Sequence, residues 1–574
     1  MLTRVFARNL GFSLVVAVLA TSVAAQTFAP PPAPAELTVA AEQITSLLRE
    51  GESLELSGRW GDALTHYEEA LREHPNDRVL ANRFDVARLH YSLEQRYDDR
   101  SFRNSVATLR SRESLDLYSD MLSKIGAHYY TDPPWHDLSS RGLRAMDIAL
   151  TDQTFLTTNR VSAGSRQIEQ LRGDLDQLGK RYMIRSRSDA VAVASQAAQM
   201  ARRQINLSET ATLLEFTAAA AGGLDHYSAF LTADQLRDVY SQIEGNFVGL
   251  GVELKADNGA LLIVHVIPGS PAKKAGILDG DRIVAVDGKS TATLSTDEAA
   301  ALLTGPEGST CRVTVVTSGA APRDLAIRRA HVEVPSLEDI KIINAEYGVA
   351  YIRIPAFQKT TARDLEAALW DLHRQGMRSL VLDLRGNPGG LLTASVEVAD
   401  MFVAEGPIVS TRGRSEQENF NYRAQRAGTW RVPLVVLIDG DSASASEIFA
   451  AAIQDARRGV VIGARSYGKG SVQGIFPLGY AGAGARITTA KFYSPLGHPI
   501  SNVGITPDID ARRATAVAQG TQSAAGALAA TGENVREVAY RGLNTTPAGA
   551  APASSDATLD LAIEVARNQP VAQL

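Results

Sequence analysis

The chain has 574 residues, of which 45% are hydrophobic, and its formal net charge at pH 7 is −6. A chain of this length should contain several domains, and its apolar content is sufficient for buried cores. The near balance of acidic and basic residues, without a long block of like charge, argues against a nucleic-acid-binding protein.

The first 25 residues have the pattern of a secretory signal peptide. Arg4 and Arg8 precede an apolar run from Gly11 to Ala20, and small residues follow as far as Ala25. We therefore predict export with cleavage near Ala25. An uncleaved membrane anchor is the alternative, but the apolar run is short for that role, because a spanning helix needs about 20 apolar residues.

A helical region should follow a short linker. The Pro/Ala-rich residues 26–36 predict an extended linker, and residues 37–104 predict helices. Within the latter, Gly58 to Ala63, Tyr67 and His74 to Asp77 resemble one tetratricopeptide unit. Such arrays normally need about three repeats, so an ordinary helical hairpin is an equal alternative. Residues 105–243 are also mainly helical by pattern.

From Phe247 the periodicity changes to that of short strands. The elements Gly269-Ser-Pro-Ala272, Ala275-Gly-Ile277 and Gly280-Asp-Arg-Ile283 occur in the order found in PDZ domains, and residues 244–334 resemble such a domain. A PDZ groove binds a peptide as an added strand and caps its terminal carboxylate. Cys311, the one cysteine, excludes an internal disulfide and is expected to be a buried thiol. The resemblance implies a carboxylate-binding loop formed by Phe247, Val248, Gly249, Leu250 and Gly251.

Residues 335–514 alternate between strand and helix patterns, which predicts a mainly parallel sheet with helices on its faces. Strands are expected at 349–354, 380–384, 434–438 and 460–463. Ligand sites in such sheets lie at the carboxyl ends of strands, where both Gly386 to Gly390 and Ser442 to Ser446 should lie. The Ala/Gly-rich residues 515–574 predict a low-complexity tail with a short terminal helix at 556–567.

Ser444 and Lys469 together suggest a serine hydrolase that uses a lysine as base. Ser444 should lie at a strand-to-helix corner beside free backbone N–H groups, which can hold an oxyanion. Lys469 follows 25 positions later among glycines. Each residue alone has a plainer interpretation. Ser444 and Glu447 fit a helix capping box, and Lys469 could be a solvated loop lysine.

Two other chemistries fit less well. Gly463 to Lys469 matches the start of a phosphate-binding loop, but Gly470 stands where Ser or Thr should bind magnesium, which argues against nucleotide binding. The sequence lacks the nucleophile elbow of a Ser-His-Asp triad, and His373 and His498 are poorly placed for such a triad.

A lysine base must be buried to lose its proton. Its apolar neighbours could provide that burial, and Gln473 could direct its amine.

Five segments in order resemble the carboxyl-terminal-processing (tail-specific) serine peptidases, which also carry a PDZ domain before the protease core. The family's Gly-Asp-Pro-Tyr-Ser element is replaced here by Leu224-Asp-His-Tyr-Ser228. The five segments are Asp383 to Gly390, Ser442 to Ile448, Tyr467 to Gln473, Tyr493 to Gly497 and Gly504 to Asp508.

The resemblance implies roles for individual residues. Ser444 would be the nucleophile, Lys469 the general base and Gln473 the residue that orients Lys469. The choice of Ser444 over Ser442 and Ser446 rests on the family's spacing to the lysine. The oxyanion hole would be formed by the backbone of Ala445, Gly389 and Gly390.

The sequence thus predicts a multidomain α/β protein: a helical N-terminal region with a tetratricopeptide-like start, a β-rich PDZ domain and a protease core that resembles ClpP and crotonase. We expect an exported, ATP-independent serine endopeptidase without cofactor or metal ion, periplasmic or envelope-associated in a bacterium. Its partners would be protein substrates with exposed C-terminal tails and an adaptor bound by the N-terminal helices, and its oligomeric state stays open. The alternatives are an inert scaffold and a non-peptidase hydrolase such as an esterase.

Overall fold

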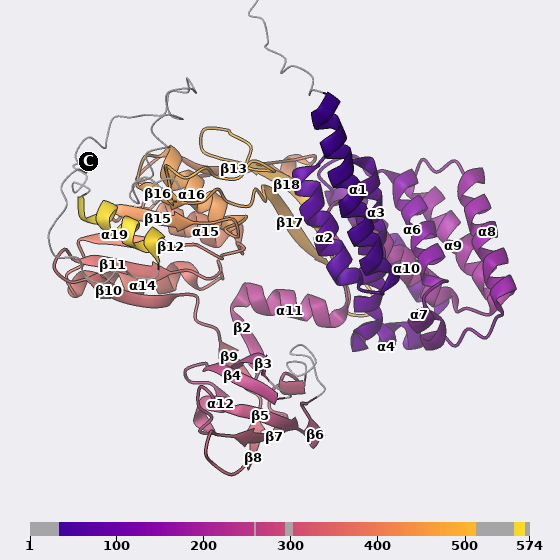
Figure 1. Cartoon of the computed structure of the whole chain (residues 1–574), viewed down its shortest axis with the longest axis horizontal. Coiled ribbons are helices and arrows are strands. Elements are labelled where there is room, and N and C mark those ends of the chain that lie inside the picture. Colours follow the sequence, from indigo (N-terminus) through magenta and orange to yellow (C-terminus); the bar gives the residue numbers. More distant parts are fainter. Residues whose placement is uncertain (1–33, 258–259, 293–301, 427, 512–555, 569–574) are drawn as a thin grey trace, which may run out of the picture. The chain divides into compact units, whose positions relative to one another are not determined.

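The computed structural model describes residues 34–257, 260–292, 302–426, 428–511 and 556–568 (Figure 1). The predicted signal peptide, most of the linker and most of the low-complexity tail lie outside the described residues. The chain separates into two compact units, Met1–Tyr91 and Ser92–Leu574. Across the described ranges, no helix combines the length and apolar character that a membrane span requires.

The first unit is helical. It contains α1 (Pro34–Leu56), α2 (Trp60–Glu73) and the start of α3 (Arg78–Asp98). The Tyr67 hydroxyl donates a hydrogen bond to Glu55 (2.8 Å), and a side chain on Gly51 would collide with the Tyr67 ring. These contacts fix a close helix pair, while the tetratricopeptide assignment stays a prediction. The core of this unit is formed by Ala63, Tyr67, Ala70, Leu80, Phe84 and Ala87.

The second unit begins with a helical layer around one buried helix. Helix α10 (Glu209–Gly222) is apolar on nearly all sides and packs against its neighbours α5, α6 and α9, as expected of a helix in a core. Its buried Glu215 pairs with Arg96. The surrounding helices are α4 (Arg100–Thr108), α5 (Ser111–His128), α6 (Trp135–Ala149), α7 (Gln153–Thr158), α8 (Ser165–Arg181) and α9 (Arg187–Ile205).

Helix α11 (Ala233–Glu244) leads into a small β-rich region with its own core. Strands pair in the order β3-β4-β5-β7-β8, while β2 pairs with β9 and β6 with β5. Cys311 is buried in this core, as predicted, and burial raises the pKa of its thiol. The elements are β2 (Asn246–Gly249), β3 (Val252–Asp257), β4 (Ala260–Val266), α12 (Pro271–Lys274), β5 (Arg282–Val286), β6 (Lys289–Ser290), β7 (Thr310–Val316), β8 (Arg323–Arg328) and β9 (Ala330–Glu333).

The predicted parallel sheet has the order β10-β11-β12-β15-β16-β19, and only the edge strand β10 runs antiparallel to its neighbour. The buried strands are continuous apolar runs, as expected for a sheet covered on both faces. The strands are β10 (Glu338–Asn344), β11 (Val349–Arg353), β12 (Ser379–Asp383), β15 (Leu434–Ile438), β16 (Val460–Gly463) and β19 (Ile509–Asp510).

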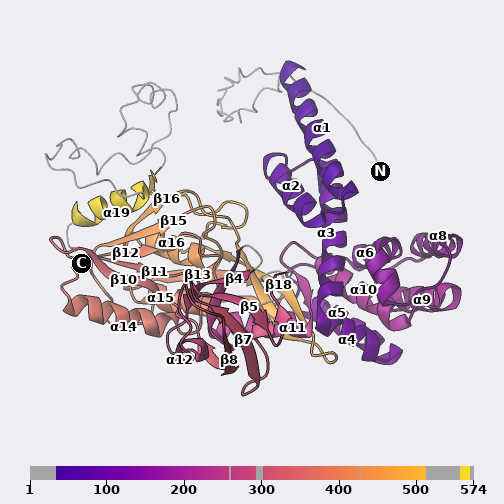
Figure 2. The ribbon, with the colours of Figure 1, turned by 60° about the horizontal axis from the view of Figure 1, so that its bottom comes forward.

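Helices cover the two faces of this sheet unequally. One face packs against α14 (Thr361–Arg374), α15 (Leu392–Asp400) and α16 (Ala445–Asp455). The other carries α19 (Ala557–Asn568), whose Ala562, Val565 and Ala566 join the core on that side. Figure 2 shows α19, in yellow, beside the strands of the sheet. The predicted terminal helix is therefore a docked part of the protease core.

A second, antiparallel sheet lies in the same unit and was not predicted as a sheet. Its order is β1-β18-β13-β14, and β17 pairs with β18. It brings the segment around Tyr227, which precedes β1, to the long β17–β18 ribbon. Its strands are β1 (Ala229–Leu231), β13 (Pro407–Gly413), β14 (Asn421–Arg423), β17 (Ser471–Pro477) and β18 (Gly484–Tyr493).

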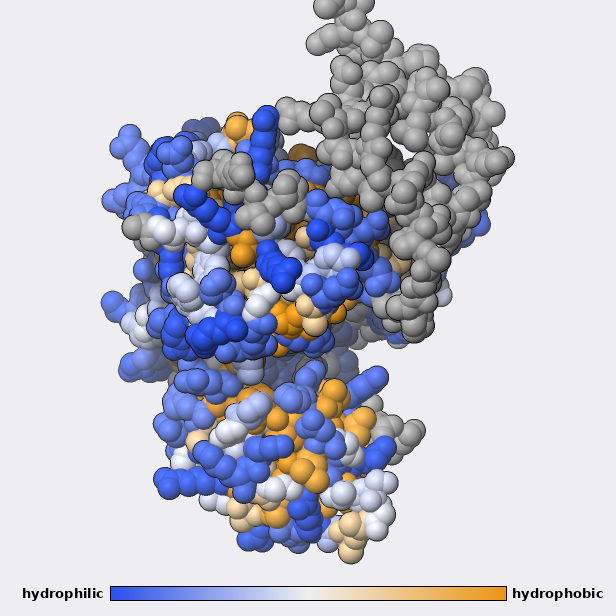
Figure 3. Space-filling model, turned by 90° about the vertical axis from the view of Figure 1, so that its left-hand side faces the viewer, coloured by the Kyte–Doolittle hydropathy of each residue, from blue (hydrophilic) through white to orange (hydrophobic). Residues whose placement is uncertain are grey.

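The surface is mainly hydrophilic on the side in Figure 3, and apolar side chains gather chiefly in the lower part of that view. Other exposed large apolar residues of the described chain include Leu496 and Val503, and Trp370 packs edge-on against Trp430, with the ring centres 4.8 Å apart. Apolar side chains scattered singly on a surface need no functional explanation.

Candidate active site

Ser444 lies at the sharp corner between β15 and α16. Its backbone has φ 55° and ψ −111°, a region that residues other than glycine rarely occupy. The side chain is partly exposed, and its hydroxyl makes no capping hydrogen bond. Backbone strain of this kind is often found at functional sites, and here it presents a hydroxyl at the end of a central strand.

The two neighbouring serines have structural positions instead. Ser442 and Ser446 are both 0% exposed. The Ser442 hydroxyl donates to the carbonyl of Leu384 (2.8 Å), and the Ser446 hydroxyl donates to the carbonyl of Asn387 (3.0 Å). Both hydroxyls thus tie the Ser444 turn to the loop that follows β12. Among these three serines, only Ser444 combines partial exposure with an uncommitted hydroxyl.

Glycine is required next to Ser444. A Cβ atom on Gly389 would lie 2.7 Å from the Cβ of Ser444. Of the three predicted oxyanion donors, Gly389 donates its N–H to Asn387 Oδ1 (2.8 Å). No hydrogen bond found within the described ranges uses the N–H groups of Gly390 or Ala445. These two amides are therefore the available donors beside the serine.

Glu447 connects the serine and the lysine. Its Oε2 accepts hydrogen bonds from the backbone N–H groups of Ser444 (2.8 Å) and Lys469 (2.9 Å). Its Oε1 accepts from the Ser466 hydroxyl (2.6 Å) and the Gly468 N–H (2.7 Å). Glu447 is 0% exposed, and burial raises the pKa of its carboxyl, although all these hydrogen bonds act in the opposite direction.

Sequence reasoning assigned Glu447 only to a capping box. The half of that box in which Glu447 accepts from Ser444 N–H is present, but the Ser444 hydroxyl takes no part in capping. The signal that could have indicated more is the position of one acidic residue in the first turn of an otherwise apolar helix. A carboxylate buried there needs donors from elsewhere in the chain, and the Ser466 to Lys469 loop provides them.

The side chain of Lys469 is in an environment suited to a base. Burial lowers the pKa of its ammonium, the nearby charge of Arg486 lowers it further, and Glu447 acts in the opposite direction. The ammonium lies over the Tyr227 ring, 5.2 Å from its centre. A lysine must lose its proton near neutral pH to act as a general base, and desolvation next to a second cation favours that loss.

Neither predicted partner bonds to the Lys469 ammonium in this arrangement. Gln473 Nε2 donates to Ser471 Oγ (2.8 Å), and for the described residues no hydrogen bond joins Lys469 Nζ to Gln473 or to Ser444 Oγ. Catalytic hydrogen bonds are often long before substrate binds. The role of Gln473 as the residue that orients Lys469 stays a prediction.

Tyr227 and Arg486 are site residues that the sequence did not reveal. Asp225 accepts hydrogen bonds from the backbone N–H groups of Tyr227 and Ser228 (both 2.8 Å), and Arg486 Nε donates to the Tyr227 carbonyl (2.8 Å). Tyr227 belongs to the element that departs from the family's Gly-Asp-Pro-Tyr-Ser pattern. The pairing of β1 with β18, together with these contacts, brings this element close to Lys469.

Replacing Arg486 with glutamine should move the acidic limb of the pH profile of kcat/KM to higher pH and lower activity at neutral pH. The charge of Arg486 lowers the pKa of Lys469, so its removal raises that pKa, and a larger fraction of the base stays protonated. Glutamine keeps an N–H donor for the Tyr227 carbonyl. Arg486→Lys, which keeps the charge, is the matched control. An acidic limb at the same pH in Arg486→Gln would refute the electrostatic role.

The predicted carboxylate-binding loop lies in the β-rich region. Phe247, Val248 and Gly249 belong to β2, which pairs with β9. Leu250 is buried in the core of the region, and Gly251 has φ 83° and packs so tightly on Ser270 that a side chain would collide with it. Residues 293–301 lie outside the described residues. The described part of the chain contains no group of His, Cys, Asp and Glu side chains that could hold a metal ion.

Comparison with known proteins assigns the class. The model of peptidase family S41 matches residues 348–511, and that of a PDZ domain matches 262–317. The carboxy-terminal-processing protease of Bartonella bacilliformis is 41% identical over 292 residues, which cover 50% of this chain and 66% of that protein. The carboxyl-terminal-processing protease of Synechocystis sp. is 35% identical over 308 residues, 53% of this chain and 71% of that protein.

A solved structure, a photosystem II D1 C-terminal processing protease, is 27% identical; the match covers 66% of this chain and 93% of that one, with a TM-score of 0.33. The two family-model matches define a serine protease core with a PDZ domain before it. This chain belongs to peptidase family S41, among its carboxyl-terminal-processing serine proteases. The predicted family and fold class are thereby confirmed, whereas the domain boundaries and the roles of individual residues stay predictions.

Proposed function

We propose that this chain is an ATP-independent serine endopeptidase in which Ser444 is the nucleophile and Lys469 the general base. The observation that carries the proposal is the shared Glu447 oxygen, to which the backbone amides of both residues donate. A strained, partly exposed serine and a desolvated lysine are thus held on adjacent segments. The same pairing supports an active enzyme over an inert scaffold.

The reaction is amide hydrolysis through an acyl-enzyme. Neutral Lys469 takes the proton of the Ser444 hydroxyl as Oγ attacks the carbonyl carbon of the scissile bond. The negative charge that develops on the carbonyl oxygen is stabilised by the N–H groups of Ala445 and Gly390, which point to no other acceptor among the described residues. Lys469 then protonates the leaving amine. It later takes a proton from the water that attacks the ester and returns that proton to Ser444 Oγ as the ester bond breaks.

Before catalysis the Lys469 side chain must leave the Tyr227 ring. The lysine side chain is long and flexible, and Glu447 accepts hydrogen bonds from the backbone N–H groups of both Lys469 and Ser444, so we expect rotation of side-chain bonds to bring Nζ to Oγ. A contact between an ammonium and an aromatic ring favours the charged form. Movement toward Ser444 therefore also favours loss of the proton.

The first test is incubation of the mature protein with an unstructured polypeptide, with and without an apolar C-terminal extension, and without ATP. Cleavage at internal bonds of the polypeptide supports an endopeptidase. Hydrolysis of small esters without cleavage of any polypeptide would instead support the esterase alternative.

Substrate choice should depend on the C-terminal tail. If the PDZ domain captures a terminal carboxylate through the loop at residues 247–251, an apolar free C-terminus should lower KM. Amidation of that terminus, or addition of Asp-Asp, should raise KM, because the captured charge is lost or new charge enters an apolar groove. Initial rates on three versions of one substrate, apolar, amidated and acidic, check this. Equal rates on all three would refute capture of the substrate's C-terminal tail by the PDZ domain.

Export to the periplasm or envelope of a bacterium is part of the proposal and rests on the signal-peptide pattern of the first 25 residues. Mass spectrometry of the N-terminus of the protein recovered from that compartment tests it, and a fragment that starts after Ala25 is the expected result.

We further propose that the helices of the first unit bind an adaptor protein, on the basis of their resemblance to a tetratricopeptide unit.

A further inference from the structure

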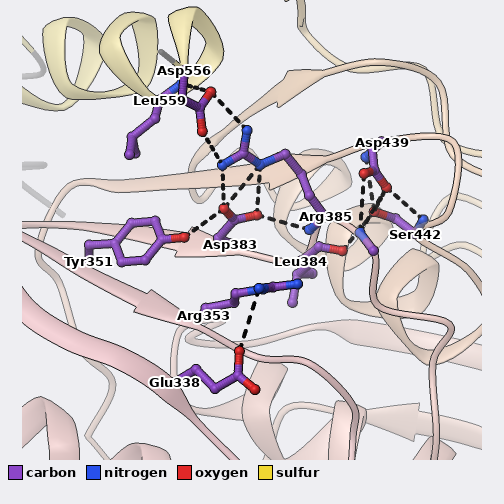
Figure 4. A network of polar contacts seen from close by, with 11 residues as sticks. Glu338, Tyr351, Arg353, Asp383, Leu384, Arg385, Asp439, Ser442, Asp556 and Leu559 are labelled. Carbon is purple, nitrogen blue, oxygen red and sulfur yellow. Dashed lines mark hydrogen bonds and ion pairs between the residues drawn. The ribbon is translucent and has the colours of Figure 1, made fainter. Parts of the chain in front are cut away.

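The docked helix α19 is joined to the active-site loop by an ion pair. Arg385 lies in the loop that follows β12 and is bonded to the Ser444 turn. Its guanidinium donates to both carboxylate oxygens of Asp556, Nη1 to Oδ1 (3.0 Å) and Nη2 to Oδ2 (2.7 Å). The same guanidinium donates to Asp383, Nε to Oδ1 (3.0 Å) and Nη2 to Oδ2 (2.6 Å). Figure 4 shows Arg385 between the two carboxylates.

Asp556 is itself held in place by the helix that it caps. Its Oδ1 accepts a hydrogen bond from the Leu559 N–H (3.0 Å), and its carbonyl accepts from the Asp560 N–H (3.1 Å). The helix packs Ala562 and Val565 against the sheet face that includes β12 and β15. Asp556 is thus a fixed anion at the carboxyl end of β12. A bidentate pair of this kind defines direction as well as charge.

The loop that starts at Arg385 is bonded to the Ser444 turn at several points. The Gly386 N–H donates to Asp439 (3.0 Å), whose Oδ1 also accepts from the N–H of Ser442 (3.0 Å). The carbonyl of Asn387 accepts from the Ala443 N–H (3.0 Å). These contacts, part of which are drawn in Figure 4, couple the loop that starts at Arg385 to the Ser444 turn, so a displacement of Arg385 would act on both.

Asp383 alone restrains the Arg385 guanidinium less completely than Asp383 and Asp556 together. Asp383 is almost fully buried and also accepts a hydrogen bond from the Tyr351 hydroxyl (2.8 Å). It bonds both the guanidinium and the backbone N–H of Arg385 (2.9 Å). Its oxygens are therefore shared among several donors, and Asp556 provides the second anion that fixes the outer side of the guanidinium.

We propose that Asp556 is a positioning residue for catalysis: through Arg385 it holds the loop 385–390, and with it the Gly390 N–H, in the geometry that stabilises the oxyanion at Ser444. The proposal rests on the proposed function. The C-terminal helix α19 then contributes to catalysis through the ion pair between Asp556 and Arg385.

The test compares Asp556→Asn with Asp560→Asn in the full-length enzyme. Asparagine is a good helix N-cap, so Asp556→Asn keeps α19 capped and removes only the charge that faces Arg385. Asp560 is exposed in the same first helical turn and has no bond to Arg385, so it is the matched control. Asp556→Glu, which restores the charge, should recover part of the loss.

We expect kcat of Asp556→Asn to fall about tenfold with KM within about twofold, because the loss of an aligned oxyanion donor acts on the transition state and not on substrate binding. Asp560→Asn should match the wild type. Equal kcat for both variants would overturn the proposal. So would a loss that matches the fall in folded fraction and disappears at a lower temperature, because a purely structural role predicts that pattern.

Hydrogen exchange separates this proposal from the proposed function. The amides of the peptide that spans residues 385–391 should exchange faster in Asp556→Asn than in Asp560→Asn, and this comparison needs no turnover. If the wild type cleaves no polypeptide, the proposed function fails and the exchange data still report whether Asp556 holds the loop. Identical exchange of that peptide in both variants would overturn the positioning role.

Discussion

Replacing Lys469 with arginine is expected to abolish peptidase activity and leave the protein folded. Arginine keeps the positive charge and much of the length of the side chain, but it cannot release its proton at any working pH. Burial and the charge of Arg486 already lower the pKa of Lys469, which is the property that a base requires and arginine lacks. Assays of polypeptide cleavage and thermal melts of the purified variant check both parts.

Lys469→Met is the matched companion to this variant. Methionine removes the charge and keeps an unbranched apolar side chain over the Tyr227 ring, so we expect no activity and no loss of thermal stability. Burial disfavours the ammonium, so the folded state does not depend on it. Appreciable turnover by Lys469→Arg would contradict a lysine base, whereas two inactive and well-folded variants are the predicted result.

Replacing Ser444 with alanine is expected to abolish activity, whereas Ser442→Ala and Ser446→Ala should retain much of it. Ser444 contributes no side-chain cap to α16, so its loss should change the free energy of unfolding by less than the ~1 kcal/mol that a capping serine provides. Each of the other two changes removes a buried hydroxyl that donates to a carbonyl. These should cost about 1 kcal/mol of stability each.

A second substitution at Ser444 separates chemistry from strain. Glycine accepts the backbone angles found there far more readily than serine, so Ser444→Gly should be inactive and at least as stable as Ser444→Ala. Labelling with a fluorophosphonate, followed by peptide mapping, should mark Ser444 in the wild type. A label at Ser442 would show that the family's spacing to the lysine had been applied to the wrong serine.

Four strands of the parallel sheet, β11, β12, β15 and β16, could be predicted almost to the residue, whereas the edge strands β10 and β19 were not expected. The expected strands 434–438 and 460–463 coincide with β15 and β16. Each of these strands is a continuous apolar run between turn residues, and this local signal is strong because both faces of the sheet are covered.

The antiparallel sheet could not be predicted in the same way. β1 is three residues long, and its partner β18 lies far from it in the sequence, at Gly484–Tyr493. A strand this short carries little periodicity, and its existence depends on a distant partner. The position of Tyr227 near Lys469 follows from that pairing, which is why the lysine's aromatic neighbour was missed.

In the candidate site, too, the residues with a local sequence signal could be predicted, and those that act through distant contacts could not. Ser444, Lys469 and the glycines could be proposed because their chemistry and spacing are local features of the sequence. Glu447 and Arg486 act through tertiary contacts, and a residue that satisfies a capping box gives no sign that it also holds a second loop. Asp556 follows a long Ala/Gly-rich stretch, so composition could not connect it to Arg385.

The most direct measurement of the central claim is trapping of the acyl-enzyme during turnover. The wild type is mixed with an unstructured polypeptide that carries an apolar C-terminus, quenched in acid within the first turnovers, digested and mapped by mass spectrometry. The account predicts a substrate fragment in ester linkage to Ser444, absent from Ser444→Ala and from Lys469→Arg. Steady cleavage with an adduct on another residue, or with the same adduct in Lys469→Arg, would contradict it.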